Sequence, residues 1–530
     1  MDTMKDLLLW TESGFGAKEA IVDFDRGVRW SYSQLNDYAR RICASYARDG
    51  GVTRGDRVGW LSMGPRADIL ALSFGLRKMG AIPVTMNARA SAESVAWMIN
   101  NVEMKALAYG SDCLELLKQI IAIGIPSVKE FVAIDGAPLG DRHLSLADLY
   151  RTYESAPEPD VTIEQDDVAL IVYTSGSTGR PKPIMHTEAT WAATSMNLAY
   201  MWSLYYDDRF LALMPPHFVG WAHVTSATLR AAASQVCLRF DPAAVARAVQ
   251  QERCTHAIFT PTLIRILFEE YRRDPSRFAD NPIRIGMLGG ETITNDVLDK
   301  LRLMFPLLER TGSFGSSEAA SLHTGLRSAR AAGDPMVLGK PLPGVTVELR
   351  DAETGELVTE PGAPGVLLVK GPTAVGIWND PEATKKSFPG GWWYSGDVLS
   401  RDKDGYMSFT GRSDHMFKSG AIKVFSEEVE EVLKRHPHVL DVIVVPVPDD
   451  RFGQVPLAFV RHNATVSGEE FERWWREQDA PGYCRPRYWI MRGTEPFPMV
   501  TAAKVDRRAL RDLAQQIYQQ SKMPTGEQTA

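Results

Sequence analysis

The sequence predicts an α/β protein with a large N-terminal domain and a small α+β C-terminal domain. Segments of strand and helix character alternate over residues 15–150, and the same pattern starts again at residue 168. Such alternation favours parallel strands covered by helices, so we expect two helix-covered, mostly parallel sheets. Glycine and proline become dense over residues 340–410, where short alternating runs indicate a small β-barrel or sheet.

The first stretch supplies one helix–strand–helix–strand series. Residues 31–43 begin with Ser31, a residue type that caps helices, and carry apolar residues at helical spacing. Residues 56–62 and 81–86 are predicted to be strands. The apolar segment 67–77 lies between them and is predicted to be a helix packed on the sheet.

The second stretch opens with a short apolar run, residues 168–173, which is typical of a buried strand. Further strands are expected at 210–214, 257–260 and 285–288, and a helix is expected at 261–271. The return of this order predicts the second parallel sheet.

A domain boundary is predicted near residues 411–414. It divides the chain into a large domain, 1–412, and a small mobile domain, 413–530. The polar tail, 523–530, is expected to be disordered.

The small domain is predicted to be a compact α+β unit. Ser426 is expected to cap a helix at 427–435, whose acids near the start and bases near the end suit the helix dipole. Strands are expected at 441–447 and 457–461.

Composition excludes several classes of protein. A net charge of −7 and a pI of about 5.9 argue against a general nucleic-acid binder, which needs a basic face. The five cysteines are widely spaced and form no CxxC or His/Cys cluster, so we expect buried free thiols in a reducing compartment. The first residues carry acids and lack the long apolar core typical of a signal peptide, and no run of about 18 apolar residues is present. We therefore expect a cytoplasmic enzyme without a membrane span.

The most informative motif lies at residues 173–184. The predicted strand 168–173 runs into a loop of backbone N–H groups and hydroxyls that can cradle phosphate oxygens. The loop residues are Thr174, Ser175, Gly176, Ser177, Thr178 and Gly179. Lys182 adds a positive charge suited to the same anion. The alternative is an ordinary surface turn, which such residues also form.

Five further segments follow the loop in a specific order: 289–291, 312–318, 393–397, 405–414 and 498–510. With them the chain resembles the adenylate-forming superfamily, which includes acyl-CoA synthetases, luciferases and the adenylation domains of nonribosomal peptide synthetases. The resemblance covers roughly residues 15–515 and is greatest to freestanding acyl-CoA synthetases. It implies that a carboxylate attacks the α-phosphorus of MgATP, giving acyl-AMP and pyrophosphate, and that CoA then displaces AMP.

The resemblance also implies a role for individual residues in binding ATP. Glu318 would hold Mg²⁺, for which a carboxylate oxygen is a suitable ligand, and Thr178 would approach the metal through phosphate. Phe314 would stack on adenine, Ser317 would touch the α-phosphate, and Asp397 with Arg412 would hold the ribose. The remaining residues of the implied nucleotide site are Gly289, Gly290, Glu291, Ser313, Gly315, Ser316 and Phe409. A surface glutamate, a core phenylalanine and a structural Asp–Arg pair remain the alternatives for these positions.

Lys504 matches the catalytic lysine of the small domain in this superfamily. Its ammonium group would reach the carboxylate and the α-phosphate together; otherwise it is a solvated surface lysine. Thr174 and His217 are the other expected catalytic residues, and Asp414 aligns with the hinge about which the small domain would rotate.

Three positions depart from the usual pattern. Ala421 stands where glycine is usual in the segment implied to line the CoA tunnel, which comprises Lys418, Ser419, Gly420 and Ala421. A methyl group there narrows the path and restricts the backbone, so use of CoA is in doubt. Ala503 and Pro183 also replace usual glycines, without an expected loss of adenylation.

The acyl pocket is expected at residues 215–223, at Thr260 and at 288–290. Its candidate lining residues are His217, Phe218, Val219, Gly220, Trp221, Thr260, Leu288 and Gly289. No acidic residue stands ready for an α-amino group, which favours a simple fatty, aromatic, alicyclic or terpenoid acid over an amino acid. His217 would orient the carboxylate or gate the pocket, and core packing is the alternative for it and for the two aromatic residues.

The leading prediction is therefore an ATP-dependent acid–CoA ligase. The first alternative is an adenylation-only enzyme that hands acyl-AMP to a partner thioesterifying ligase. A luciferase-like oxygenase and an inactive protein that binds an acyl group or nucleotide are weaker alternatives. The sequence is compatible with a homodimer and does not specify the acid or the pathway.

Overall fold

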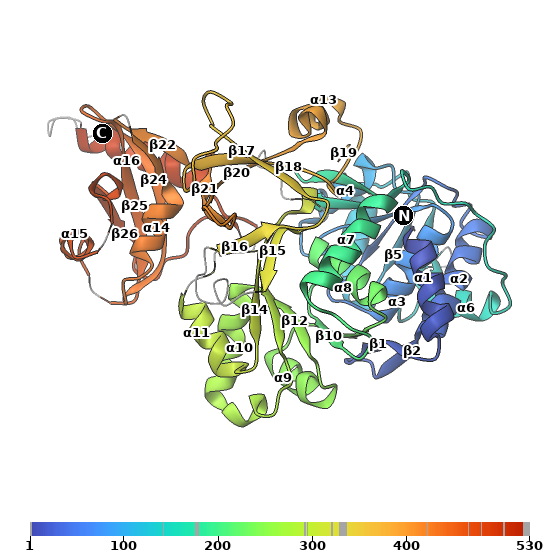
Figure 1. The fold of residues 1–530 in the computed structure, drawn as a ribbon. Coiled ribbons are helices and arrows are strands. Elements are labelled where there is room, and N and C mark those ends of the chain that lie inside the picture. Colours follow the sequence, from blue (N-terminus) through green and yellow to red (C-terminus); the bar gives the residue numbers. More distant parts are fainter. Residues whose placement is uncertain are drawn as a thin grey trace. The chain divides into compact units, whose positions relative to one another are not determined.

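The computed structural model describes residues 3–140, 143–174, 180–290, 293, 295–319, 322–327, 337–420, 422–464, 466–478, 480–501 and 504–522. The chain forms two compact units (Figure 1). The first comprises 1–347, 369–394 and 405–407, and the second comprises 348–368, 395–404 and 408–530. The predicted boundary between residues 412 and 413 falls inside the second unit and stays a prediction.

The first sheet of the N-terminal unit has the strand order β19–β9–β8–β4–β3–β5–β6–β7. The parallel strands are β3 (Arg57–Leu61), β4 (Ile82–Thr85), β5 (Ala106–Tyr109), β6 (Glu130–Ala133), β7 (His143–Ser145) and β8 (Val168–Thr174). Two antiparallel strands, β9 (Lys182–Thr187) and β19 (Gly376–Ile377), close one edge. The predicted strands at 56–62 and 81–86 are thus confirmed as β3 and β4.

The strands of the second sheet in this unit follow the order β16–β15–β14–β13–β12–β10–β11–β1–β2. Its parallel members are β1 (Glu19–Asp23), β10 (Arg209–Ala212), β11 (Ser234–Cys237), β12 (His256–Phe259), β13 (Ile285–Leu288) and β14 (Glu309–Gly315). The antiparallel members are β2 (Val28–Ser31), β15 (Leu322–Arg327) and β16 (Val337–Pro341). Two mostly parallel sheets are therefore present, as predicted.

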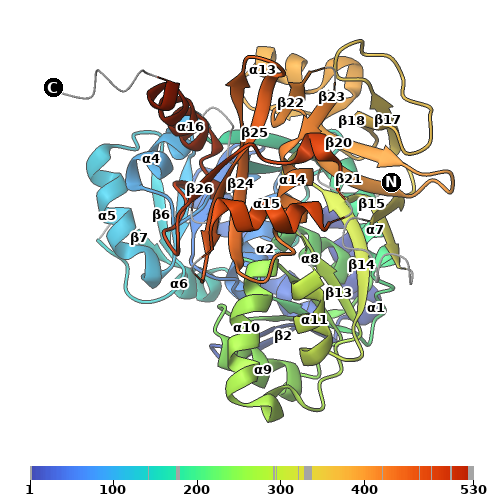
Figure 2. The same ribbon diagram turned by 90° about the vertical axis from the view of Figure 1, so that its left-hand side faces the viewer.

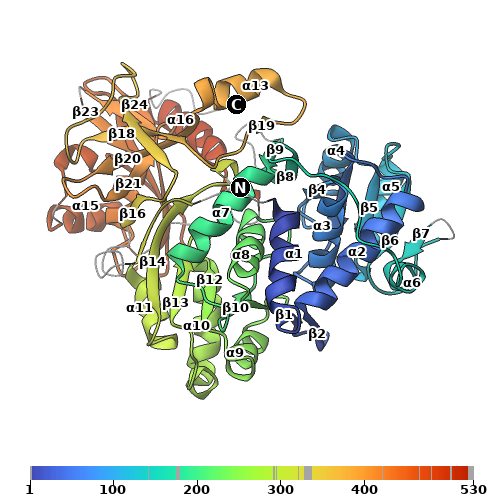
Figure 3. The same ribbon diagram turned by 45° about the vertical axis from the view of Figure 1, so that its right-hand side comes forward.

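Helices cover both sheets. Their bounds are α1 Met4–Phe15, α2 Tyr32–Arg48, α3 Ala67–Lys78, α4 Ala92–Asn101, α5 Leu114–Ile123, α6 Leu146–Thr152, α7 Glu188–Met201, α8 Val219–Arg230, α9 Pro242–Gln251, α10 Pro261–Arg273, α11 Asn295–Met304 and α13 Pro381–Ser387. Helices α1, α7 and α8 contact one another, and Figure 3 shows α8, α1 and α3 side by side. One core joins these helices to both sheets, because it contains Trp60 of β3 and Phe210 of β10.

Sequence features account for the start of α2. The Ser31 hydroxyl accepts the N–H of Gln34 at 3.2 Å, and the Gln34 side chain accepts the N–H of Ser31 at 2.8 Å. This capping box satisfies two backbone groups that the helix leaves unpaired. The predicted cap at Ser31 is confirmed.

The second unit begins with strands β17 (Thr346–Arg350), β18 (Pro364–Lys370), β20 (Trp393–Arg401) and β21 (Met407–Arg412), which neighbour one another in that order. These strands are the β-structure predicted for residues 340–410. A separate sheet follows, with the order β23–β22–β25–β24 and with β26 beside β25. Its strands are β22 (Met416–Ser419), β23 (Ile422–Phe425), β24 (Val439–Asp449), β25 (Gly453–His462) and β26 (Tyr488–Met491).

The helices of this unit are α14 (Ser426–Leu433), α15 (Gly468–Arg476) and α16 (Arg507–Lys522). Helices α14 and α16 contact β24, and α15 contacts β26 (Figure 2). A short pair, β27 (Met499–Thr501) and β28 (Lys504–Val505), precedes α16. The α+β character of the small domain is confirmed.

The prediction that Ser426 caps this helix is wrong. Helix α14 starts at Ser426 itself, and Phe425 occupies the cap position without a side-chain hydrogen bond. The Ser426 hydroxyl instead donates to the carbonyl oxygen of His415 at 3.1 Å. That hydrogen bond ties the start of α14 to the residue beside the predicted hinge.

Two further predictions concern chemistry outside the site. All five cysteines are buried free thiols, as predicted. Among the helices in the described ranges, none has the length and apolar character needed to cross a bilayer. The predicted disordered tail, 523–530, lies outside the described residues.

Candidate active site

The ends of the predicted phosphate loop are held together by strand pairing. Strand β8 ends at Thr174 and β9 begins at Lys182, and these two residues are partners in the antiparallel register. Both are partly buried. The loop between them, Ser175–Gly179, lies outside the described residues, but its two ends are fixed beside each other.

The carboxyl ends of four neighbouring parallel strands bring most of the other candidates to one sheet edge. Strand β10 leads toward His217, β12 toward Thr260, β13 toward Gly289 and β14 toward Phe314. The carboxyl edge of an open parallel sheet is the usual place for a ligand. The sequence motifs at 215–223, 260, 288–290 and 312–318 are therefore brought together in space.

The turns at this edge show why small residues stand there. Gly290 has φ +84°, a conformation that residues with a Cβ rarely adopt. A Cβ on Gly220 would have Met214 at 3.5 Å as its nearest neighbour, and one on Gly289 would have Met287 at 3.7 Å. These are ordinary van der Waals distances, so a Cβ at either glycine would touch a methionine side chain without a clash.

Phe314 lies near the end of β14, and Glu318 lies on the turn that follows this strand. Phe314 is half-buried and opposite Thr324, and the register shifts between Phe314 and Gly315. Such an irregularity re-aims side chains. Glu318 lies on a 3₁₀ turn, Ser317–Ala319, whose position is fixed because the Glu318 carbonyl oxygen accepts the N–H of Ala374 at 2.8 Å.

The described side chains at this edge suit an Mg²⁺ ion that is bound mainly through phosphate. They do not form a site in which the protein supplies most of the metal ligands. Among the described residues no group of three or more His, Cys, Asp or Glu side chains could hold an ion. Glu318 offers a single, partly buried carboxylate. Mg²⁺ is commonly bound by one or two carboxylates together with substrate phosphates, so the residue fits that role. Glu291 and Thr178 lie outside the described residues, and the side chain of Ser313 is not described.

His217 is a buried, neutral histidine. Its ring packs on Phe218 with 4.3 Å between centroids, and its Nδ1 has no hydrogen-bond partner among the described residues. Burial, aided by the charge of Arg89, lowers the pKa of His217 from its ordinary 6.5 to about 4. Thr85 at the end of β4 donates to the His217 carbonyl oxygen at 3.4 Å, which links the two sheets.

This pKa predicts a pH dependence of stability. The unfolded chain takes up a proton on His217 near pH 6.5, whereas the folded chain does so only near pH 4. Stability is therefore lost as the pH falls from 6.5 to 4, by about 3 kcal/mol for this ring. Denaturant unfolding of His217→Gln should show a correspondingly smaller loss between pH 7 and 4. Equal losses in wild type and His217→Gln would contradict the assignment.

Other candidates for the acyl pocket differ in exposure. Phe218 is 49% exposed at the start of α8. Trp221 and Leu288 are buried in core clusters, and the Trp221 ring lies 5.8 Å from that of Trp60. Thr260 caps α10, because its hydroxyl accepts the N–H of Leu263 at 3.2 Å. The packing and capping contacts of these three residues are local structural roles, and their part in the pocket stays a prediction.

In the second unit, Arg412 lies between two carboxylates. Its Nη1 donates to Asp397 Oδ1 at 2.9 Å and to the Ser395 carbonyl oxygen at 3.2 Å, and its Nε donates to Asp414 Oδ1 at 3.1 Å. Burial disfavours its charge, but Asp397 and Asp414 outweigh this and raise the pKa of Arg412. Arg412 also lowers the pKa of Asp414 against the effect of burial. The ribose-binding pair and the hinge residue of the prediction thus form one charged cluster.

Close packing of the backbone fixes this cluster. Gly396 has φ +73°, and a Cβ there would lie 3.1 Å from Arg412. The Ser413 N–H and hydroxyl both donate to the Gly396 carbonyl oxygen, at 2.8 and 2.9 Å. The Ser395–Asp397 segment of β20 therefore packs against the guanidinium. Phe409 lies on the same strand as Arg412 and is partly buried.

The remaining candidates of this unit lie on two hairpins. Lys504 starts β28, and its side chain and residues 502–503 are not described. On the other hairpin, Lys418 pairs with Glu353 at 2.6 Å, Ser419 is buried, and Gly420 has φ +63°. Ala421 lies outside the described residues.

Residues 10–377 match the family described as AMP-binding enzyme, and residues 428–499 match the AMP-binding enzyme C-terminal domain. The chain belongs to the AMP-binding enzyme family. This confirms the predicted membership in the adenylate-forming superfamily.

Curated relatives of this AMP-binding enzyme align with it over nearly its full length. A feruloyl-CoA synthase of Amycolatopsis sp is 30% identical over 488 residues, covering 90% of this chain and 93% of the relative. The putative acyl-CoA synthetase YngI of Bacillus subtilis (strain 168) is 27% identical over 550 residues, with 96% of each chain covered. A 3-hydroxybenzoate–CoA ligase of Aromatoleum sp. (strain CIB) is 29% identical over 522 residues, with 94% of each covered.

Solved structures confirm the fold of the AMP-binding enzyme. The anthranilate CoA ligase AuaEII, in complex with anthranoyl-AMP, superposes with a TM-score of 0.84 at 24% identity and covers 98% of each chain. ATP-bound MatB from Rhodopseudomonas palustris has a TM-score of 0.81 at 25% identity, covering 97% of this chain and 99% of that one.

Sequence reasoning missed two residues beside the candidate site. Thr85 ends β4 and Arg89 follows it, and they act on His217 through a hydrogen bond and through charge, respectively. The only sequence signal was the position of Thr85 at the end of a predicted parallel strand, where site residues commonly lie.

Proposed function

We propose that this AMP-binding enzyme joins a carboxylic acid to CoA in two steps through acyl-AMP. The observation that carries the proposal is the edge where β10, β12, β13 and β14 end, which collects Phe314, Glu318, Gly289 and His217. The names of the curated relatives, which are CoA ligases and acyl-CoA synthetases, support the same reaction class.

In the first step, a carboxylate oxygen of the acid bonds to the α-phosphorus of ATP. The bond from that phosphorus to the bridging oxygen breaks, and pyrophosphate leaves with the electron pair. Residues 174–179 and Lys182 bind the β- and γ-phosphates, because backbone N–H groups and an ammonium suit that anion. Glu318 would hold Mg²⁺, which would supply positive charge to stabilise the departing pyrophosphate.

The nucleoside is positioned by the remaining residues. Phe314 stacks on adenine and Gly289–Gly290 let the backbone approach it, whereas Asp397 accepts hydrogen bonds from the ribose hydroxyls. The Asp397 carboxylate is held in place by Arg412 at 2.9 Å. Lys504 stabilises the charge that develops around phosphorus, which is the kind of electrostatic effect that lowers such barriers most.

In the second step, the sulfur of CoA attacks the acyl carbon and AMP leaves as the mixed-anhydride bond breaks. The thiol proton passes to solvent. Residues 418–421 line the approach of CoA after the small domain turns about Asp414. In the first step His217 stays neutral, so its Nδ1, which has no partner among the described residues, can hydrogen-bond the substrate carboxylate without adding charge.

The acid is a simple apolar or aromatic carboxylic acid. Gly220 and Gly289 place no side chain at this sheet edge, and the exposed Phe218 ring, two residues before Gly220, offers an apolar wall. Feruloyl, 3-hydroxybenzoate and fatty-acid specificities occur among the names of the relatives. We infer that the substrate belongs to this range.

Mass spectrometry of products tests the proposal. The protein is incubated with MgATP and a panel of fatty and aromatic acids, with and without CoA. Pyrophosphate with acyl-AMP in the absence of CoA, and acyl-CoA in its presence, is the expected result. ADP and phosphate as products, or no turnover with any acid, would contradict it.

The alternative of an adenylation-only enzyme rests on Ala421, and a substitution tests it. Removing the methyl group in Ala421→Gly widens the path and frees the backbone. We expect acyl transfer to CoA to rise about threefold to tenfold, with ATP–pyrophosphate exchange unchanged. Single-turnover kinetics with preformed acyl-AMP measures the first rate.

Ala363→Gly, in the loop before β18, is the matched control and should leave both rates unchanged. If the wild type already transfers the acyl group to CoA as fast as it forms acyl-AMP, Ala421 does not limit the second step. Acyl-AMP that persists with CoA in both the wild type and Ala421→Gly would support the adenylation-only alternative.

A further inference from the structure

Hairpin β22–β23 is attached to the turn that follows β17 by two ion pairs. Lys423 Nζ lies 2.8 Å from Asp351 Oδ2, and Lys418 Nζ lies 2.6 Å from Glu353 Oε1. The two lysines are direct partners in the ladder of the hairpin. Like charges opposite each other across a ladder are unfavourable, so the hairpin needs the two acids in this place.

The acids are presented by a fixed turn. Asp351 Oδ1 accepts the N–H groups of Glu353 at 2.9 Å and Thr354 at 3.0 Å, which leaves Oδ2 directed to Lys423. The hydrogen bond from Lys423, followed by these two N–H groups, lowers the pKa of Asp351 far below its ordinary value. The turn therefore holds the Asp351 carboxylate in the position that pairs with Lys423 of the hairpin.

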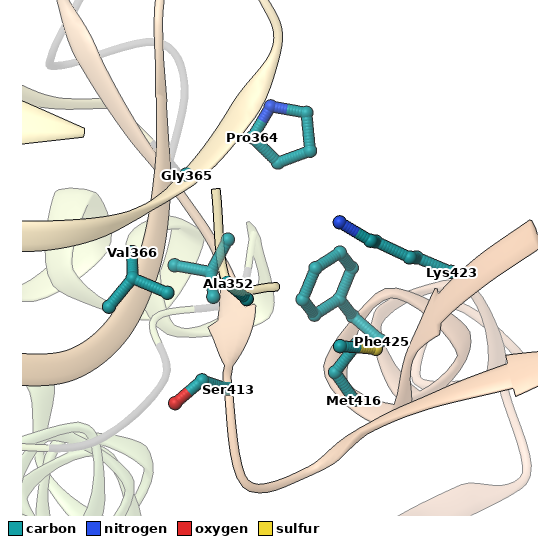
Figure 4. A pocket seen from close by; sticks show the side chains of 9 residues that line it. Ala352, Pro364, Gly365, Val366, Ser413, Met416, Lys423 and Phe425 are labelled. Carbon is teal, nitrogen blue, oxygen red and sulfur yellow. The ribbon is translucent and has the colours of Figure 1, made fainter. Parts of the chain in front are cut away.

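An apolar contact lies beside the ion pairs. Phe425 at the end of the hairpin forms a buried cluster with Val366 and Val398, and Met416 packs against it. Figure 4 shows Phe425 and Lys423 facing the strand segment with Pro364 and Val366. The cavity between them has a volume of about 10 Å³, which is room for about one water molecule. The contact is thus closely packed.

This contact spans the predicted hinge. Asp351, Glu353, Val366 and Val398 precede Asp414 in the chain, whereas the hairpin follows it. A rotation about Asp414 that moves the hairpin must break both ion pairs and separate the apolar cluster. Lys418, one of the predicted CoA-tunnel residues, is held by Glu353 until that happens.

We propose that the pairs Asp351–Lys423 and Glu353–Lys418 form a latch that holds the hairpin on the 351–354 turn and must open before CoA can react. The proposal rests on the two-step function given above and adds a regulated step between its halves. Opening the latch favours acyl transfer and leaves adenylation unchanged. Lys423 and Asp351 act as positioning residues, because neither belongs to the proposed nucleotide site or acyl pocket.

The solvent exposure of the two ion pairs determines how much each one stabilises the latch. The Lys418 and Glu353 side chains are 51% and 47% exposed, whereas those of Lys423 and Asp351 are 30% and 31% exposed. Exposed pairs contribute little and are weakened by salt. The Lys423–Asp351 pair therefore contributes most, and substitutions at Lys423 leave the turn at Asp351 intact.

Hydrogen–deuterium exchange of the full-length protein tests the latch without reference to catalysis. In Lys423→Glu, repulsion by Asp351 should speed exchange in residues 416–425 about tenfold; Lys423→Gln should give about threefold, and Lys423→Arg less than twofold. Arg476→Gln, which breaks the exposed Glu472–Arg476 pair within α15, is the matched control and should not change exchange in the hairpin. Unchanged exchange in Lys423→Glu, or equal effects of Arg and Glu, would overturn the latch.

Single-turnover rates then test whether opening of the latch controls acyl transfer to CoA. The ratio of acyl transfer to adenylation should rise about tenfold in Lys423→Glu and return to the wild-type value in Lys423→Arg. Faster exchange with an unchanged ratio would overturn the gating role. Faster exchange in a protein that makes no acyl-CoA with any acid would leave the latch standing and contradict the proposed function instead.

Discussion

Lys504→Ala should lower acid-dependent ATP–pyrophosphate exchange at least about 100-fold, the usual effect of removing one electrostatic donor from a transition state. The ammonium group is expected to bridge the attacking carboxylate and the α-phosphate, so its loss acts on the rate of the first step. Exchange of labelled pyrophosphate into ATP at saturating acid measures that step alone. Binding of ATP should change much less, because the phosphate loop and Asp397 remain.

Lys403→Ala provides the control for Lys504, since it removes an exposed lysine of the same unit. Its exchange rate should equal that of the wild type. A Lys504→Ala protein that keeps the wild-type exchange rate would remove this lysine from the first step.

Asp397→Ala should lower kcat/KM for ATP about 100-fold, because it removes a charged hydrogen-bond acceptor from the ribose site and one partner of Arg412. The Arg412 guanidinium would keep Asp414 at 3.1 Å and the Ser395 carbonyl oxygen at 3.2 Å, but it would lose Asp397 at 2.9 Å. Steady-state kinetics over a range of ATP concentrations measures the change.

Two further variants show whether the effect of Asp397→Ala is due to the loss of the carboxylate at this position. Asp397→Glu keeps the charge and should recover part of the lost ATP affinity. Asp299→Ala breaks an exposed Asp–Arg pair on α11, 2.7 Å long, and should have no effect on kcat/KM. An Asp397→Ala enzyme with unchanged KM for ATP and a lowered melting temperature would show a purely structural Asp397–Arg412 pair.

The parallel strands were predictable because each is a short apolar run between helical segments. Strands β3, β4, β12 and β13 coincide with such runs to within about a residue or two at each end, the usual uncertainty of element boundaries. Helix α1 was missed, although Thr3 and Asp6 form a capping box at its start. That signal is local and weak, and burial of the helix against α7 and α8 decides the outcome.

The cap at Ser426 was predicted wrongly for a related reason. A serine before an acidic, amphipathic segment has the composition of a cap. The hydroxyl instead donates to the carbonyl oxygen of His415, the residue just before β22, a contact that no local pattern shows. The local sequence predicts which residues are able to cap a helix, and tertiary contacts determine which of them do so.

The candidate site was predictable to the extent that its motifs follow strands. Parallel neighbours bring their carboxyl ends together, so Thr260, Gly289 and Phe314 meet once the order β12–β13–β14 is known. The latch could not be predicted, because Asp351 and Lys423 are 72 residues apart and neither belongs to a motif. The same limit applies to the acid, since the exposure of Phe218 and the burial of Trp221 depend on packing.

Transfer of oxygen from the acid to AMP tests the central claim most directly. The protein is incubated with MgATP, CoA and a turned-over acid whose carboxylate carries ¹⁸O, and the products are analysed by mass spectrometry. If the carboxylate attacks the α-phosphorus, each AMP carries one ¹⁸O atom and pyrophosphate carries none. Label in inorganic phosphate, or AMP without label while acyl-CoA accumulates, would contradict an acyl-AMP intermediate.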